Sequence, residues 1–212
     1  MTEKLYLSER ATTGRAKICA IKSGENSSVC LTTSLFHPQG GGQKADRGTI
    51  EGIAVLHVVH NNGEIDHYVE NIDSFTLGQE VEIVVDEQWR LLNSKYHSAG
   101  HLIAALGEKL FPGIQAVAGH HWPGEARVEF TGDLPDTKQF QEAMIPALAE
   151  AIQADLPVRI CGDPFKNRSI SIGDFPAVPC GGTHPERLGV LEKVEISKIK
   201  IKQGKLRVSY SL

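Results

Sequence analysis

The chain has 212 residues, of which 41% are hydrophobic and 23% charged, and a formal net charge of −4 at pH 7. This composition is typical of one or two globular domains and argues against a disordered chain, a coiled coil or a disulfide scaffold. No apolar run approaches the roughly 20 residues of a membrane-spanning helix, and the N-terminus lacks the features of a secretory signal. We therefore expect a cytoplasmic protein that binds no membrane.

The first 85 residues show short runs of β-branched residues separated by turn sequences, which predicts strands with little helix. The runs cover 17–21, 29–32, 53–59 and 80–85. Several short strands of this kind favour a small β-barrel. Cys19 and Cys30 are interpreted as small buried residues of strands. His57, His60 and His67 are interpreted as structural or surface residues rather than as a second metal site.

The pattern changes near residue 86. From there to Leu110 the apolar residues recur with the 3.6-residue period of an α-helix. Asp86 is the expected N-cap of this helix, and Pro112-Gly113 is the expected stop signal. The first domain boundary is therefore expected at residue 86.

The remaining segment mixes one further helix with strands. The helix is predicted at 137–154, with Asp136 as its cap and Pro146 as a kink or break. Strands are predicted at 126–130, 158–161, 190–199 and 205–210. The sequence thus predicts an α+β protein of two domains, a β-barrel at 1–86 and an α+β domain with helices on an antiparallel sheet at 87–212.

Two pairs of metal-ligating residues stand out. His97 and His101 are four apart in the predicted long helix, so both imidazoles project from one face. Cys180 and His184 are also four apart, and the two glycines between them allow a turn that brings both to one point. Three imidazole nitrogens and one thiolate suit tetrahedral zinc. Because Ser98 stands where zinc proteases carry their general-base glutamate, a protease mechanism is disfavoured.

These motifs resemble the AlaX family, freestanding relatives of the editing domain of alanyl-tRNA synthetase. The match comprises His97-x3-His101, Cys180-Gly181-Gly182-Thr183-His184 and the Gly40-Gly41-Gly42-Gln43 loop, in the same order over nearly the whole chain. The resemblance implies a small SH3-like β-barrel followed by the α+β domain shared with threonyl- and alanyl-tRNA synthetases. It also implies a zinc-dependent hydrolase that removes serine, and often glycine, from tRNA(Ala) in trans.

The resemblance implies roles for residues around the zinc. Gln43 is expected to reach the site from the barrel loop, and Thr183 either orients a ligand or water or only caps its turn. Relatives often carry threonine or glutamine in the pocket some 20 positions after the first histidine, where this chain has the segment 117–121. His120 or His121 supplies the contact to the serine hydroxyl here, or both are exposed loop residues.

The role of zinc stays open at this point. Four protein ligands are typical of a closed structural site, whereas catalytic zinc keeps one position free. Either one ligand is loose, or the coordination expands to five, or the ion binds the substrate amino group while a water is held elsewhere.

The expected partner is misacylated tRNA(Ala), with neither DNA nor membrane, and the protein is expected to be a monomer or a weak homo-oligomer. Residues 187–212 carry a charge of +5 and the remainder −9, which indicates an anionic partner at one end. Lys198, Lys200 and Lys202 alternate there, so in a strand they would share a face that follows phosphates or protects a sheet edge. Alternative functions are a deacylase of Ser-tRNA(Thr) and a non-catalytic tRNA-binding module with a structural zinc.

Overall fold

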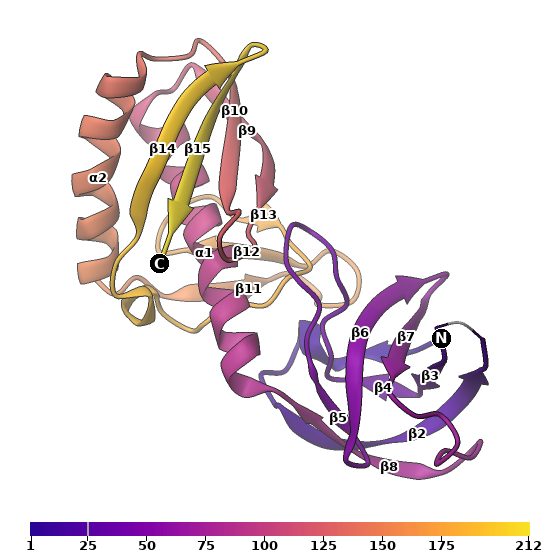
Figure 1. Cartoon of the computed structure of the whole chain (residues 1–212). Helices are drawn as coiled ribbons and strands as arrows, with labels where there is room; N and C mark the ends of the chain where they lie inside the picture. Colours follow the sequence, from indigo (N-terminus) through magenta and orange to yellow (C-terminus); the bar gives the residue numbers. More distant parts are fainter. Residues whose placement is uncertain (25) are drawn as a thin grey trace.

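A computed structural model describes the chain at residues 1–24 and 26–212. In Figure 1 the strands of the first half form one body, and helix α1 (Glu87–Leu110) runs out of it into a second body of helices and strands. The architecture is therefore mixed α and β, and the long helix connects its two parts.

The first body is a closed barrel in which β2, β3, β7, β6, β5 and β8 follow one another around the wall. Every neighbouring pair around that wall is antiparallel. The strands of this part are β1 (Glu3–Lys4), β2 (Thr13–Lys22), β3 (Ser28–Leu31), β4 (Thr33–Ser34), β5 (Gly48–Ile50), β6 (Ile53–Asn61), β7 (Glu64–Val69) and β8 (Glu80–Val85), with a 3₁₀ helix at Leu5–Leu7.

The barrel closes because alternate side chains of its strands are apolar and point inward. In β8, Val81, Ile83 and Val85 are buried while Glu80 and Glu82 are exposed. The resulting core is separate from that of the second body. The expectation of a buried Cys19 is wrong, because Ala16 and Ile18 are the inward-facing residues of this part of β2 and Cys19 lies on its exposed face.

The second body has a sheet in the order β14-β15-β10-β9 and a smaller sheet in the order β11-β12-β13. Both helices pack on one side of the larger sheet, α1 against β9 and β10 and α2 against β14 (Figure 1). The elements after α1 are β9 (Ile114–His120), β10 (Arg127–Gly132), α2 (Thr137–Gln153), β11 (Val158–Cys161), β12 (Ser169–Ile172), β13 (Val178–Pro179), a 3₁₀ helix at Leu188–Leu191, β14 (Glu195–Lys202) and β15 (Lys205–Ser211).

Both helix caps are confirmed. The Asp86 carboxylate accepts a hydrogen bond from the backbone N–H of Trp89 at 3.0 Å, and that of Asp136 accepts one from Lys138 at 2.8 Å. Of the kink or break predicted at Pro146, the break is wrong, because α2 continues through this residue. Pro146 lies on the exposed side of the helix, where water can satisfy the carbonyl that loses its partner.

Two strand predictions need correction. The strand expected at 190–199 begins only at Glu195, because Leu188–Leu191 forms a 3₁₀ helix and Glu192 turns the chain with a φ of 59°. Strand β9, which ends at His120, was not expected, since its sequence has few β-branched residues. It is held instead by pairing with β10 along its length.

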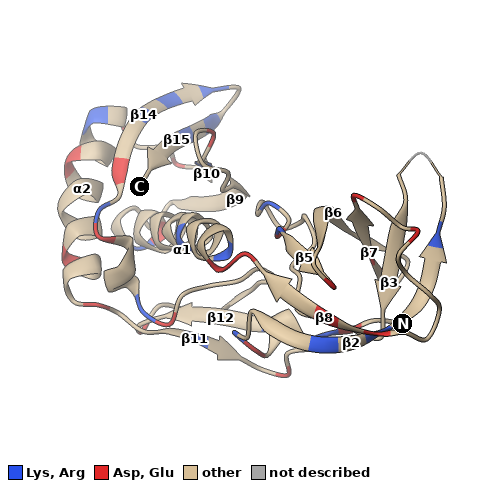
Figure 2. Ribbon diagram, turned by 60° about the horizontal axis from the view of Figure 1, so that its bottom comes forward, with Lys and Arg blue, Asp and Glu red and all other residues tan. Residues whose placement is uncertain are grey.

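Strand β14 lies at the edge of its sheet, so its lysines border solvent. Figure 2 shows the basic residues gathered along this strand and its turn into β15. No helix in the described ranges is both long and apolar enough to span a lipid bilayer.

Candidate metal centre

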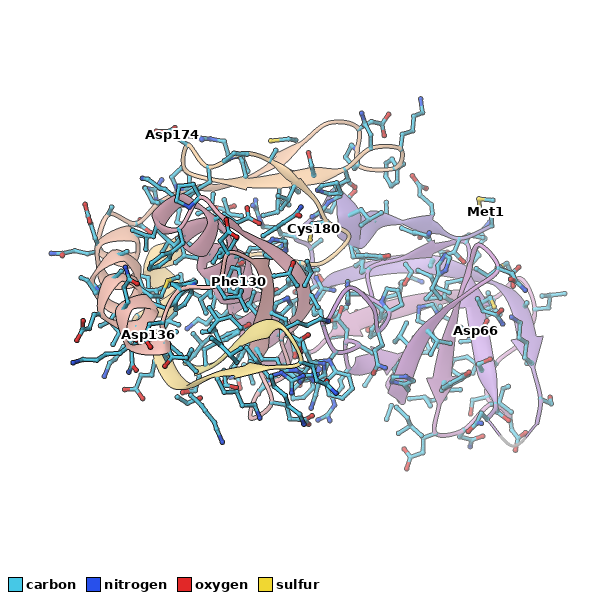
Figure 3. The ribbon with its side chains drawn as sticks, turned by 90° about the horizontal axis from the view of Figure 1, so that it is seen from above. Met1, Asp66, Phe130, Asp136, Asp174 and Cys180 are labelled. Carbon is cyan, nitrogen blue, oxygen red and sulfur yellow. The ribbon has the colours of Figure 1, made fainter. Side chains whose placement is uncertain are left out.

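Four metal-ligating side chains from two distant segments meet between the barrel and the second body. One ligand atom from each of His97, His101, Cys180 and His184 lies within 4.8 Å of the corresponding atom of the other three. The Nε2 atoms of His97 and His101 are 3.1 Å apart, and Cys180 Sγ is 3.2 Å from His184 Nε2. Figure 3 shows Cys180 on the turn that approaches the barrel. The local spacing explains each pair, and tertiary packing unites the two pairs.

Gln43 from the barrel loop orients the first ligand. Its Oε1 accepts hydrogen bonds from Thr183 N–H at 2.9 Å and from His97 Nδ1–H at 2.7 Å, while its Nε2 donates to Thr183 Oγ1 at 2.7 Å. Because the amide is bound on both sides, its orientation is determined, and His97 must carry its proton on Nδ1. His97 Nε2 therefore carries no proton, and its lone pair, which can bind a metal ion, faces the other three side chains.

Ser94 and Ser98 complete the support of the cluster from α1. Ser94 Oγ lies 2.6 Å from Thr183 Oγ1, and Ser98 Oγ lies 2.8 Å from His184 Nδ1. Since Nδ1 of His184 is engaged by Ser98, its Nε2 is the ring nitrogen that faces the cluster, 3.2 Å from Cys180 Sγ. The two serines were not predicted as site residues, although positions 94, 97, 98 and 101 have the i, i+3, i+4, i+7 spacing of one helix face.

Arg168 is a further residue that the sequence did not indicate. Its guanidinium donates from Nη1 to the Cys180 carbonyl oxygen and from Nε to the Leu7 carbonyl oxygen at 2.9 Å. It therefore ties the turn that carries Cys180 to the N-terminal segment.

The electrostatics of the cluster favour uncharged imidazoles. Burial, followed by repulsion from neighbouring histidines, lowers the pKa of His97 well below 6.5, and burial lowers the pKa of His101 to about 4. Burial raises the pKa of the Cys180 thiol, an effect opposed by the Gly182 N–H and by Arg168. Neutral imidazoles whose lone pairs converge beside a thiol are suited to a cation. Three nitrogens and one sulfur fit zinc by donor type and number.

His121 is brought to the cluster, and His120 is not. The His121 ring stacks on that of His97 with centroids 4.9 Å apart, and its Nδ1 lies 2.7 Å from Tyr210 Oη. Tyr210 itself donates to the Tyr96 carbonyl oxygen at 2.8 Å, so His121 must be the donor to Tyr210. His120 instead packs against Trp122, at 4.7 Å between ring centroids.

Glycines on three elements make room for the His121 ring. A Cβ on Gly100 would lie 2.2 Å from the ring, one on Gly119 would lie 2.4 Å from it, and one on Gly42 would lie 3.0 Å from it. Gly42 also has a φ of 80°, which favours glycine. Tyr210 and the glycines of α1 and β9 were missed because only the folded chain unites them.

The barrel loop is fastened to α1 by a buried ion pair. Arg90 Nε donates to both carboxylate oxygens of Asp46 at 2.9 Å, and Asp46 also accepts from His37 N–H. Both charged groups are almost fully buried. The pair sets how the loop that carries Gln43 meets the helix that carries the histidines.

A cavity of about 990 Å³ opens beside the cluster. His101, His121 and Gly119 border it at one end, and it extends along α1 toward Phe175. Its walls are mostly alanine and aliphatic side chains, with Glu108 and Lys109 among the polar ones. The metal centre thus lies next to a space large enough for a small organic group.

Comparison with known proteins identifies relatives of this chain, although no family model matches it. It is 31% identical to the alanyl-tRNA editing protein AlaX-M of Pyrococcus horikoshii over 98% of this chain and 96% of the relative. AlaX-M of Saccharolobus solfataricus is 30% identical over 95% and 84%. Aarsd1 of Bos taurus, another alanyl-tRNA editing protein, is 31% identical over 79% of this chain but only 41% of its own length.

Proposed function

The chain belongs to the AlaX family of alanyl-tRNA editing proteins and is thus an aminoacyl-tRNA hydrolase, and we propose that its substrate is Ser-tRNA(Ala). Gly-tRNA(Ala) is proposed as a second substrate. Such an activity is needed because a synthetase pocket shaped for alanine cannot strongly reject the same side chain with a hydroxyl added. A separate hydrolytic site supplies the missing discrimination, and its substrate is found where tRNA is charged, in the cytoplasm.

One observation carries the proposal: four donor atoms converge beside a cavity that His101 borders, and Gln43 supports them from the barrel. We propose that His97, His101, Cys180 and His184 hold Zn²⁺. When bound, the ion would supply positive charge to the substrate carbonyl or hold the substrate amino group. The cavity would receive the aminoacyl end of the tRNA.

The other roles are assigned to residues of the chain. Gln43 keeps a proton on Nδ1 of His97 and Ser98 engages Nδ1 of His184, so each Nε2 faces the cluster. The Thr183 hydroxyl is engaged with both Gln43 and Ser94, so we assign it to holding the turn rather than to contacting substrate.

His121 is assigned to the serine hydroxyl. Tyr210 Oη accepts a hydrogen bond from His121 Nδ1–H, so His121 Nε2 is an acceptor, and no described residue makes a hydrogen bond to it. His121 also borders the cavity. A glycyl ester has no hydroxyl to offer this nitrogen, so the contact would favour serine.

The finer domain assignment belongs to the same proposal. Residues 1–86 would form an SH3-like barrel domain and residues 87–212 the editing domain. Two separate hydrophobic cores support this division. The buried Asp46–Arg90 pair would then be a contact between the domains.

A second candidate function is a non-catalytic tRNA-binding module. The complete set of four protein ligands favours it, because such sets are typical of structural zinc. A deacylase of Ser-tRNA(Thr) remains the alternative within the same class.

The test is hydrolysis of purified Ser-, Gly- and Ala-tRNA(Ala) and of Ser-tRNA(Thr) by the wild type and by Cys180→Ala. We expect fast loss of Ser-tRNA(Ala), little loss of Ala-tRNA(Ala), and weak activity of the variant. Preferential loss of Ser-tRNA(Thr) would reassign the substrate. No hydrolysis of any of the four by folded, zinc-loaded protein would favour the binding module.

A further inference from the structure

Both tryptophans of the chain lie in one cluster just outside the metal centre. Lys44 Nζ lies 5.0 Å from the Trp122 ring centre and 5.7 Å from that of Trp89, so its ammonium bridges the two indoles. The Arg47 guanidinium lies 3.9 Å from the Trp89 ring centre. His120 packs against Trp122 from the β9 side. We refer to these five residues as the indole platform.

The cations of the platform are held in place but not neutralised. Each is positioned over an indole face, an attraction that orients a cation without removing its charge. Within residues 1–24 and 26–212 no carboxylate forms an ion pair with Lys44 or Arg47, whereas Arg90 close by is paired with Asp46. The Trp89 ring is fixed in turn, because its Nε1–H donates to the Ala45 carbonyl oxygen at 2.9 Å.

The platform adjoins the metal centre along the chain at two points. Gln43 contacts His97, and the next residue, Lys44, lies on the platform. His121 stacks on His97, and the next residue, Trp122, also lies on the platform. Gln43 and Lys44 are consecutive, as are His121 and Trp122, so each of the two segments contributes one residue to the cluster and the next residue to the platform.

We propose that the indole platform binds the phosphates of the single-stranded 3′ end of tRNA as its esterified terminus enters the cavity. The proposal rests on the proposed function, which requires that this end of the RNA reach the metal centre. Lys44 and Arg47 place two positive charges beside the site of a chain whose net charge is −4. They would attract the RNA backbone, and each phosphate contact would release counterions.

The experiment measures binding of uncharged, fluorescently labelled tRNA(Ala) by anisotropy over a range of salt concentrations. The variant is the double substitution Lys44→Gln and Arg47→Gln. Losing two phosphate contacts should reduce the slope of log K against log salt by about 1.4 and weaken binding roughly tenfold or more near 0.1 M salt. Deacylation of Ser-tRNA(Ala) should show a raised KM with little change in kcat, because the lost contacts hold the RNA and not the reacting atoms.

Two controls separate the platform from general charge effects. Lys138→Gln removes an exposed cation on α2 and should leave both affinity and salt slope unchanged. Lys198→Gln with Lys200→Gln removes two cations from β14, and a larger effect there than at the platform would overturn the proposal. An unchanged salt slope and KM in the platform variant would also overturn it.

The tryptophans provide a readout that requires no label. Since Trp89 and Trp122 are the only tryptophans, their emission reports on the platform alone. Binding of tRNA should change it in the wild type, and less so in Trp122→Phe. If the wild type binds tRNA with this change in emission but hydrolyses no ester, the proposed function fails while the platform stands. If it hydrolyses Ser-tRNA(Ala) without the change, the platform fails alone.

Discussion

The barrel and the second body each contain a cluster of potential metal ligands, and the two differ in what lies among the donor atoms. In the barrel, ligand atoms of Cys30, Glu64 and Asp66 lie within 4.8 Å of one another, as do those of the four proposed zinc ligands. Figure 3 shows Asp66 within the barrel and Cys180 at its border with the second body. By proximity alone the two clusters are equivalent.

The acidic groups of the barrel cluster are already paired with a cation, the ammonium group of Lys22. Lys22 Nζ lies 2.6 Å from an Asp66 oxygen and 3.2 Å from a Glu64 oxygen, and the Cys30 thiol donates to Asp66 at 2.9 Å. Burial and the hydrogen bond to Asp66 raise the pKa of Cys30 to about 12, which keeps it a thiol. In the second body the Arg168 guanidinium is bound to the carbonyl oxygens of Cys180 and Leu7, and among the described residues no lysine ammonium contacts the imidazole nitrogens, whose lone pairs face one another. Charge balance, more than distance, distinguishes a metal site from a structural network.

The largest effect on zinc content and activity is expected from substituting the cysteine of each cluster in turn. Cys180→Ser should lose bound zinc and lower kcat/KM by more than the roughly 100-fold upper range for loss of a supporting residue. Cys30→Ser, the matched change in the barrel, should keep both. Metal content by mass spectrometry and deacylation rates check this. Loss of zinc from Cys30→Ser would invalidate the distinction between the clusters.

The next effect concerns pH and a buried histidine of the barrel. His67 Nδ1 donates to the Val29 carbonyl oxygen and its Nε2 accepts from Ser34, and burial lowers its pKa to about 4. Because the unfolded chain binds this proton more readily, stability is complete above the unfolded pKa and falls as pH drops from there toward 4. The loss from this residue should reach about 3 kcal/mol.

Urea unfolding of the metal-free protein at several pH values, compared with His67→Gln, measures that contribution. The variant should show a shallower loss of stability with acid than the wild type. If the free energy of unfolding fell equally with pH in both proteins, His67 would not titrate between its unfolded pKa and pH 4.

Gln43→Met tests the support that the barrel provides to the metal centre. Methionine has a similar shape, but its thioether sulfur is a poor acceptor for the hydrogen bond from His97 Nδ1–H. The affinity for zinc should therefore fall roughly 10- to 100-fold. Competition with a chelating dye measures the affinity. Gln39→Met is the control, because Gln39 is exposed on the same loop and should have no effect.

The smallest effect is expected from Lys22→Met. Lys22 is 38% exposed, so its loss should destabilise the fold by only about 1–2 kcal/mol. The sharper result is that the zinc-loaded variant, unlike the zinc-loaded wild type, should show a higher melting temperature when further Zn²⁺ is added. If it gains none, the absence of the ammonium is insufficient to create a cation site.

Local features of the fold were predictable from sequence, and long-range corrections were not. The caps at Asp86 and Asp136 act within one helical turn, so residue type alone indicates them. Strand β9 was missed because its stability comes from pairing with β10 rather than from its own residues. For the same reason its last residue, His120, could not be distinguished from His121 by pattern.

Residue spacing alone predicts that His97 lies beside His101 and Cys180 beside His184, because helix and turn periodicity are local properties. The contact of Gln43 with Thr183 and the position of Lys22 among the acidic groups of the barrel follow from long-range packing. Such contacts join segments from different strands, helices and turns. They depend on how the barrel packs on α1 and on how its strands register, which residue spacing along the chain does not specify.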